Sequence, residues 1–199
     1  MEKVFTLRQL SGKSNQPAAL SEAVLVLVDA QNTYRSGLLA LDGIEAALDE
    51  CARLLARARA LGTPVIHIQH DSGPGSPFDI RAEIGAIADK VAPRDGETVI
   101  VKRLPNAFVG TDLDERLKAL DKRKLIVAGF MSHMCINSTA RGAYSLGYEV
   151  TVPAAATATR SLPAPGGGTV AAATLQTSAL AALADVFAVI ADNAAAIPD

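Results

Sequence analysis

Short apolar runs alternate with longer segments of helical periodicity along this chain. The first run, residues 24–28, reads Val-Leu-Val-Leu-Val and is followed by Asp29, which is typical of a strand buried on both faces. Similar runs at 64–68, 98–101, 124–128, 148–152 and 186–190 predict five further strands. Helical spacing of apolar residues predicts helices at 44–61, 113–120 and 135–146, and the Ala-rich stretch 170–184 indicates another.

Strands that alternate with helices predict an α/β fold, in which helices cover both faces of a parallel sheet. Right-handed crossovers then give a three-layer, doubly wound, Rossmann-like fold with a six-stranded, mainly parallel sheet. Gly/Pro/Ser-rich loops are expected at 71–77 and 163–168, but neither is long enough to be a linker between domains. We therefore expect residues 1–199 to form a single domain.

Composition and charge narrow the class of protein. The 199 residues are 49% hydrophobic, which is enough for a substantial core, and the formal net charge is −2. Only residues 122–124 form a tight basic cluster, so the basic stripe of a nucleic-acid-binding protein is missing. We found no signal peptide pattern and no apolar run approaching the roughly 20 residues of a membrane span. We expect a cytoplasmic protein that binds neither nucleic acid nor membrane.

Four reactive side chains fall at the carboxyl ends of predicted strands, where open parallel sheets bind their ligands. Asp29 ends the first strand, His70 follows the second, Lys102 ends the third and Cys135 follows the fourth. An acid, an imidazole, an amine and a thiol are thereby directed to one edge of the sheet.

Cys135 lies near the start of a predicted helix, where unpaired N–H groups and the helix dipole favour an anion. A thiol there is expected to have a lowered pKa and to be a better nucleophile, and a carboxylate such as Asp29 is suited to accept its proton. Alternatively, Cys135 is a small buried hydrophobic residue, Asp29 a turn residue and Lys102 a solvated surface cation. The common location of the three residues favours catalysis.

Three segments carry a resemblance to a known family. The first segment, residues 25–34, contains an apolar strand followed by Asp29-Ala-Gln-Asn. In the second segment, Val-Lys102-Arg is followed by Asn-Ala-Phe-Val-Gly-Thr-Asp-Leu at 106–113. Residues 127–141 contain Gly-Phe-Met-Ser-His-Met-Cys135 and then Thr-Ala-Arg. Together these segments, in this order, resemble the isochorismatase-like hydrolases over residues 24–159.

The resemblance implies the fold of that family and a Cys-Asp-Lys site. Cys135 would be the nucleophile, Asp29 the general base and then acid, and Lys102 the electrostatic partner. The family also implies a cis peptide between Phe130 and Met131 before the helix. The N–H groups of Met131 and Cys135 would then form the oxyanion hole.

This sequence departs from the metal-binding members of the superfamily. Nicotinamidases carry an Asp-x-His motif just after the second strand, whereas residues 68–73 read Ile-Gln-His-Asp-Ser-Gly. We therefore expect no catalytic metal and no cofactor, and we interpret His67 as a core hydrogen-bonding residue. True isochorismatases of the superfamily lack the cysteine, so Cys135 argues against cleavage of an enol ether.

Substrate binding is assigned to four residues in loops near the same edge: Tyr34, His70, Phe108 and His133. Alternatively they pack against a loop or a second subunit, and Phe78 could reach a partner's site. We expect a homodimer or homotetramer, in which helix 170–184 contacts either another copy or its own sheet.

These observations predict a cysteine hydrolase that cleaves a C–N bond of a small amide or carbamoyl compound through a thioester. The alternatives are a catalytically silent small-molecule-binding member, an isochorismatase-type hydrolase, a metal-dependent hydrolase using His67, His70 and His133, and a redox-sensing thiol protein. The Asp-x-His departure weighs against the metal-dependent alternative. No second cysteine lies close to Cys135 in the sequence, which weighs against redox sensing.

Overall fold

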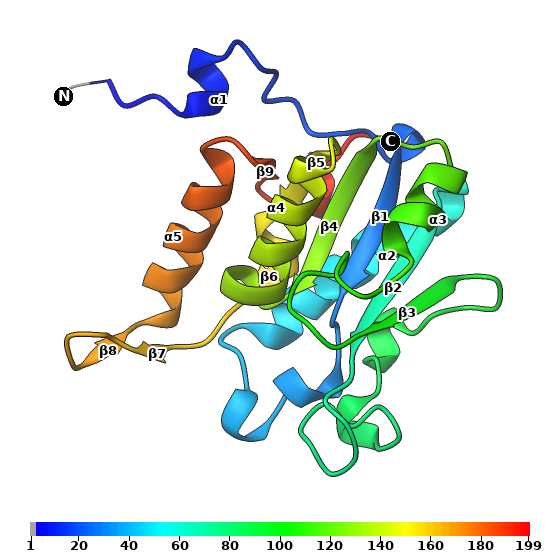
Figure 1. Ribbon diagram of the computed structural model, residues 1–199, viewed down its shortest axis with the longest axis vertical. Coiled ribbons are helices and arrows are strands. Elements are labelled where there is room, and N and C mark those ends of the chain that lie inside the picture. The colour runs from blue at the N-terminus through cyan, green and yellow to red at the C-terminus, as the bar shows by residue number, and fades with distance from the viewer. Residues whose placement is uncertain (1–2) are drawn as a thin grey trace.

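A parallel sheet forms the centre of the protein, for which a computed structural model describes residues 3–199. Six of its strands lie in the order β3-β2-β1-β4-β5-β9 (Figure 1). They are β1 (Ala23–Val28), β2 (Val65–His70), β3 (Thr98–Lys102), β4 (Lys124–Phe130), β5 (Glu149–Pro153) and β9 (Ala188–Ala191). Every pair of neighbours is parallel, so the predicted α/β class and sheet are confirmed.

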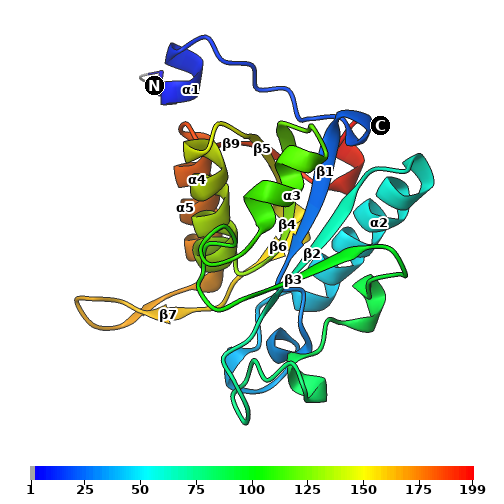
Figure 2. The same ribbon diagram turned by 45° about the vertical axis from the view of Figure 1, so that its right-hand side comes forward.

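Helices cover both faces of this sheet, as a doubly wound fold requires (Figure 2). Helix α2 (Ile44–Leu61) packs on one face. Helices α3 (Leu113–Ala119), α4 (Asn137–Ser145) and α5 (Ala172–Ala184) pack on the other. Leu183 of α5 is fully buried in that second core, so this helix does pack against the sheet of its own chain.

The sequence of β1 explains why the layers form. Leu25 and Leu27 enter the core beneath α2, while Val24, Val26 and Val28 enter the core on the opposite face. All six residues of the strand are buried, and alternate side chains of a strand point to opposite faces. An uninterrupted apolar run was therefore the correct sign of a central strand with helices on both sides.

Several element bounds differ from the sequence-based expectation. Strands β2 and β4 extend to His70 and Phe130, so His70 is the last residue of its strand rather than a loop residue. Helix α4 begins at Asn137, because residues 132–136 form a separate π-helical turn. The expected 163–168 loop is the tip of a short antiparallel pair, β7 (Leu162–Pro163) and β8 (Thr169–Val170). The short helix α1 (Leu7–Leu10) had not been predicted.

An additional strand, β6 (Thr157–Ala158), changes the carboxyl edge of the sheet. It pairs with the last residues of β4, Gly129 with Thr157 and Phe130 with Ala158. Strand β5 pairs only with the first part of β4, so β6 takes over the position beside the end of that strand. Two residues are too few to give a periodic pattern, which is why the sequence did not predict this strand.

The strand order locates the switch point of the fold. From β1 the chain runs outward through β2 to β3, then returns to β4 beside β1 and runs outward the other way. Ligands of such sheets bind outside the carboxyl ends of the strands at this reversal. That position here lies between the ends of β1 and β4.

Candidate active site

Asp29 leaves β1 at the switch point in a left-handed backbone conformation with a φ of 49°. Few residues other than glycine adopt this conformation, and aspartate is among those that do. The N–H of Asp29 donates to the carbonyl of Ile68 at 2.9 Å, so the residue is still fastened to the neighbouring strand. The carboxylate is fully buried.

Lys102 ends β3, which β2 separates from β1, and its side chain reaches Asp29. Its Nζ lies 2.7 Å from Oδ2 of Asp29 and 3.4 Å from Sγ of Cys135. The side chain is 1% exposed although it carries a charge, and such a cation is stable only with partners.

Cys135 lies in the π-helical turn 132–136 that connects β4 to α4. The turn can start where it does because Gly129 has a φ of 116° and lies directly against β1. A Cβ at this position would be 2.0 Å from the carbonyl oxygen of Val28. The peptide between Phe130 and Met131 is cis, as the family resemblance implied.

The electrostatics of the thiol differ from the sequence-based expectation. Burial, together with the nearby Asp29 carboxylate, raises the pKa of Cys135 to about 12, although Lys102 acts in the opposite direction. The expectation of a lowered pKa was wrong, because the thiol is 6% exposed and faces an anion as well as a cation. Burial also raises the pKa of Asp29, against the influence of Lys102. At neutral pH the resting sulfur of Cys135 is therefore a thiol.

His70 is the third neighbour of the Lys102 ammonium, at 3.1 Å from Nζ to Nδ1. An ammonium only donates, so Nδ1 accepts and the proton of the neutral ring is on Nε2, which donates to Oγ of Ser72 at 3.0 Å. Burial, and next Lys102, lowers the pKa of His70 to about 4. The ring is therefore uncharged at neutral pH.

Gln31 fixes the backbone of His70, a role that sequence reasoning did not assign. Its side chain accepts from the N–H of His70 at 2.9 Å and donates to the carbonyls of His70 at 3.0 Å and Gly85 at 2.7 Å. The residue is fully buried. The Asp29-Ala-Gln31 spacing was the available signal, since it places both residues after the same strand.

Tyr34 belongs to an aromatic cluster close to Asp29 and Cys135. Its ring packs edge-on against Phe78 at 5.6 Å and Phe130 at 6.0 Å, and Phe78 in turn packs against His70 at 4.9 Å. Burial and then the charges of Asp29 and Cys135 raise the pKa of the Tyr34 phenol. Phe78 thus contacts aromatic residues of its own chain.

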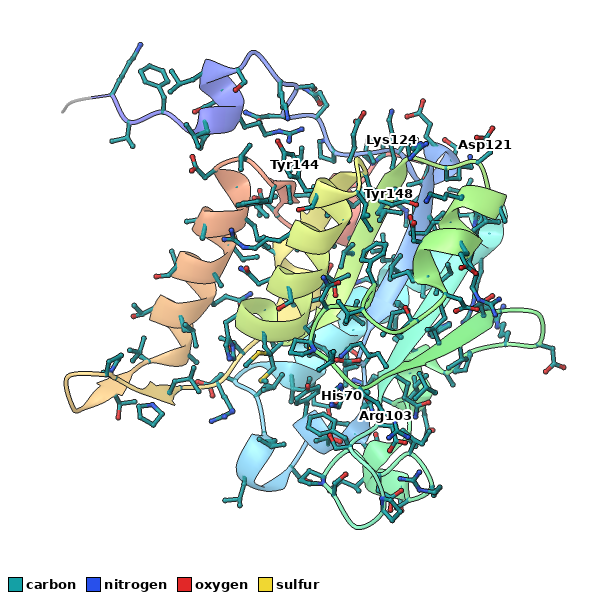
Figure 3. The ribbon with its side chains drawn as sticks, viewed as in Figure 1. His70, Arg103, Asp121, Lys124, Tyr144 and Tyr148 are labelled. Atoms are coloured by element: carbon teal, nitrogen blue, oxygen red, sulfur yellow. The ribbon has the colours of Figure 1, made fainter. Side chains whose placement is uncertain are left out.

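Phe108 and His133 have different positions. Phe108 stacks on Tyr148 at 5.9 Å, and Figure 3 shows Tyr148 at the end of the sheet opposite to His70. The ring of Phe108 is partly buried and packs against the second core, and its assignment to the substrate site stays a prediction. His133 shares the turn of Cys135, and its Nδ1 lies 2.5 Å from Oγ1 of Thr159.

The three histidines do not converge on one point. His67 lies 2.9 Å from a Glu97 oxygen, in agreement with its interpretation as a core hydrogen-bonding residue, whereas His70 and His133 contact Lys102 and Thr159. Over residues 3–199, no three His, Cys, Asp or Glu side chains are grouped so that they could hold a metal ion. The arrangement favours acid–base and nucleophilic chemistry.

Comparison with known proteins identifies the family of this chain. A family model described as the isochorismatase domain matches residues 23–195. The chain belongs to the isochorismatase family, a family of hydrolases. A crystal structure of an isochorismatase from Pseudomonas putida is 40% identical, has a TM-score of 0.94 and is matched over 98% of this chain and 100% of that one.

Two curated relatives differ in what their names describe. A secreted isochorismatase effector of Verticillium dahliae is 35% identical over 183 residues, which cover 92% of this chain and 94% of the relative. A streptothricin hydrolase of Streptomyces noursei is 36% identical over 176 residues, which cover 87% of this chain and 63% of the relative.

The first of these relatives is secreted, so the expected cytoplasmic location of this chain stays a prediction. Within residues 3–199, no helix has the length and apolar character that crossing a membrane requires.

Proposed function

We propose that this chain is a cysteine hydrolase that cleaves a C–N bond of a small amide or carbamoyl compound. Cys135 is the nucleophile, Asp29 the proton acceptor and donor, and Lys102 the electrostatic partner. One observation carries the proposal: a single buried ammonium lies within contact distance of both the Asp29 carboxylate and the Cys135 thiol, at the switch point of the sheet.

The first step transfers the thiol proton to Asp29 while Sγ attacks the carbonyl carbon of the substrate. The raised pKa of Cys135 means that the thiol does not ionise by itself at neutral pH, so a base must take its proton during the attack. Asp29 suits this task because burial raises its own pKa toward that of the thiol. The N–H groups of Met131 and Cys135 are the proposed donors to the oxyanion.

The second step breaks the C–N bond. Asp29 returns the proton to the leaving nitrogen, which departs as ammonia or an amine, and the acyl group remains on sulfur as a thioester. A water molecule then loses a proton to Asp29 and attacks the thioester carbonyl. The acid product leaves, the proton returns to sulfur and the starting state is restored.

His70 takes the role of a positioning residue in this scheme. An ammonium has three N–H bonds, and the three acceptors around Nζ are Asp29, Cys135 and His70. The contact with His70 fixes the rotation of the ammonium and thereby directs its other two N–H bonds. Tyr34 and His133 remain the proposed contacts to substrate.

A second candidate, an isochorismatase-type hydrolase, is favoured by the name of the Verticillium dahliae relative. Cleavage of an enol ether needs a proton donor to carbon and no nucleophilic thiol. Asp29 and Lys102 could serve that reaction without Cys135. The two functions therefore differ in their dependence on the cysteine.

Single-turnover ammonia release from a panel of small amides tests the proposal, with native chain and Cys135→Ala compared. Release by the native chain that is lost in Cys135→Ala supports the cysteine hydrolase. A Cys135→Ala variant that retains full activity on any substrate of the native chain, isochorismate included, would sink it. Circular dichroism of both proteins controls for folding.

A further inference from the structure

Gln176 of helix α5 connects that helix to two segments at the end of β4. Its Oε1 accepts a hydrogen bond from the hydroxyl of Ser132, the first residue of the cysteine turn, residues 132–136. Its Nε2 donates to Oγ1 of Thr157 at 2.8 Å, at the start of β6. Both ends of one amide therefore join α5 to the cysteine turn and to β6.

Thr157 fixes the direction of these hydrogen bonds. Its hydroxyl donates to the carbonyl of Ala154 at 2.8 Å, and because a hydroxyl has a single hydrogen, the oxygen accepts from Gln176. The Nε2 group of Gln176 must then face Thr157, which leaves Oε1 to face Ser132. The fully buried Ser132 hydroxyl is consequently the donor in its contact with α5.

Helix α5 is a firm support for this contact. Leu183, near its end, is fully buried in the second core. The N–H of Ala172, its first residue, donates to Oγ of Ser161 at 3.1 Å. Between these points Asn137 of α4 donates to a carbonyl of α5 at 3.3 Å, and the two helices lie side by side (Figure 1). The position of Gln176 is thus set by the packing of the whole helix.

Ser132 lies in the chain between the two proposed donors to the oxyanion, the N–H groups of Met131 and Cys135. Within the turn, the carbonyl of Met131 accepts from the N–H of Met134 at 3.0 Å and from that of Ile136 at 3.2 Å. These bonds hold the residues of the turn relative to one another. The hydroxyl of Ser132 attaches the turn to a separate element, α5.

We propose that Gln176 is a positioning residue, which through Ser132 holds the N–H of Met131 where the oxyanion forms. A donor stabilises an oxyanion only from about 2.7–3.1 Å, and a misplacement of about 1 Å can cost 10²-fold in rate. The inference rests on the proposed function, because it assumes attack by Cys135 on a carbonyl. Gln176 takes no part in the transfer of protons.

Two reagents distinguish the oxyanion hole from other properties of the thiol. With p-nitrophenyl acetate, Sγ of Cys135 bonds to the carbonyl carbon, a tetrahedral oxyanion forms, and coloured p-nitrophenolate leaves. With iodoacetamide, the same sulfur displaces iodide at a saturated carbon, and no oxyanion forms. The ratio of the acylation rate to the alkylation rate therefore reports the oxyanion hole, because altered ionisation or access of the thiol affects both rates. Cys135→Ala is the blank for labelling at Cys51.

Gln176→Leu should lower this ratio about ten-fold or more, which is less than the roughly 10²- to 10³-fold cost of removing an oxyanion donor outright. Ser132→Ala removes the same hydrogen bond from the other side and should give a similar loss. The double variant should lose no more than either single variant, since one hydrogen bond can be lost only once.

Thr177→Val is the matched control. Thr177 is the next residue of α5, and its hydroxyl donates to the carbonyl of Ala173 at 2.9 Å on the exposed face of the helix. This variant also loses a side-chain hydrogen bond of α5, but one with no link to the cysteine turn. It should keep the native ratio.

A native ratio in both Gln176→Leu and Ser132→Ala would overturn the proposal, and so would losses that add up in the double variant. If the Leu variant does not fold, the ratio of Ser132→Ala decides. In each of these cases acylation that depends on Cys135 leaves the proposed hydrolase standing. Acylation of the native chain no faster than that of Cys135→Ala would instead remove the nucleophile, and the role of Gln176 would fall with it.

Discussion

Asp29 acts on the reactivity of Cys135 in two opposite ways. Its charge raises the thiol pKa, which makes the resting thiol less reactive, yet its carboxylate is the proposed acceptor of the thiol proton. A variant that removes the charge but keeps the shape separates the two effects.

Asp29→Asn should therefore reduce turnover roughly 10²- to 10⁴-fold, the usual contribution of a general base. The same substitution should move the pH midpoint of Cys135 alkylation to lower pH, because the anion that raises the thiol pKa is gone and Lys102 remains. Iodoacetamide labelling across a pH series measures the midpoint, with Cys135→Ala as blank. An unchanged or higher midpoint would contradict this account of the thiol.

The contact between His70 and Lys102 provides a second test at the residue scale. His70→Leu removes the acceptor and should lower kcat about ten-fold or more, since the ammonium loses one charged hydrogen bond and its fixed rotation. His70→Asn offers Oδ1 at a similar distance from the backbone and should retain most of the activity. Steady-state kinetics on the best amide substrate separates this positioning role from a role in substrate binding. If His70 bound substrate instead, His70→Leu would raise KM, and His70→Asn would not restore the native value.

At the scale of elements, the junction of β1 with β4 decides where the cysteine turn begins. Gly129 is opposite Val28 in the register, and its φ of 116° is unfavourable for any side chain. Because glycine has no side chain, the ends of the two strands can approach each other at this point. Asp29 and Cys135 lie close together as a result. The Thr-Ala-Arg part of the cysteine motif has a separate, structural role. The hydroxyl of Thr139 accepts a hydrogen bond from the N–H of Ala107 at 3.1 Å, which fastens the segment after β3 to helix α4.

Gly129→Ala should destabilise the protein by more than about 4 kcal/mol, because the new Cβ would overlap the backbone of β1 and neither strand can move aside. Gly147→Ala is the matched control. Its φ is 87°, but no atom lies within 4 Å of the added Cβ, so only conformational strain of about 1–2 kcal/mol is expected. Urea denaturation compares both variants, and similar losses of unfolding free energy would refute the steric argument.

For the whole molecule, buried titratable groups set the pH range of stability. The pKa values of His67, His70 and His133 are lowered, chiefly by burial, to about 4 for His70. Below the ordinary histidine pKa of 6.5 the unfolded chain takes up protons that the folded chain does not, so stability falls with pH from 6.5 toward 4. The cysteines affect stability at alkaline pH, because burial raises the pKa of Cys51 and Cys135 from 9.0 to about 12.

Thermal unfolding from pH 4 to pH 11 should therefore show the highest Tm between about pH 6.5 and 9, with losses on both sides. Above pH 9 the unfolded chain releases thiol protons that the folded chain retains. Cys51→Ala removes one of these groups, in helix α2, and should flatten the alkaline limb relative to the native chain. A Tm that keeps rising above pH 9 would contradict the burial of the two thiols.

Assembly also belongs to this scale. The expected homodimer or homotetramer stays a prediction, as does the absence of nucleic-acid and membrane partners. Helix α5 packs Leu183 on its own sheet while several of its other residues remain exposed, so both alternatives for this helix have a structural basis.

The amino-acid sequence by itself determined the layers and the location of the chemistry. Strands such as β1, buried on both faces, show as continuous apolar runs, and parallel topology directs their carboxyl ends to one edge. Asp29, Lys102 and Cys135 were therefore recognisable as neighbours, and the motif spacing indicated the family. These features depend on local periodicity and on rules of chain connection, both of which a single sequence carries.

Only the tertiary structure decided the rest. The thiol pKa depends on burial and on a carboxylate from another strand, and local position near a helix suggested the opposite direction. Phe108 packs on Tyr148 because of how the segment after β3 folds back, which no motif specifies. Gln31 and His70 gain their meaning from contacts between residues distant in sequence. Such contacts follow from packing, and packing is a property of the whole fold.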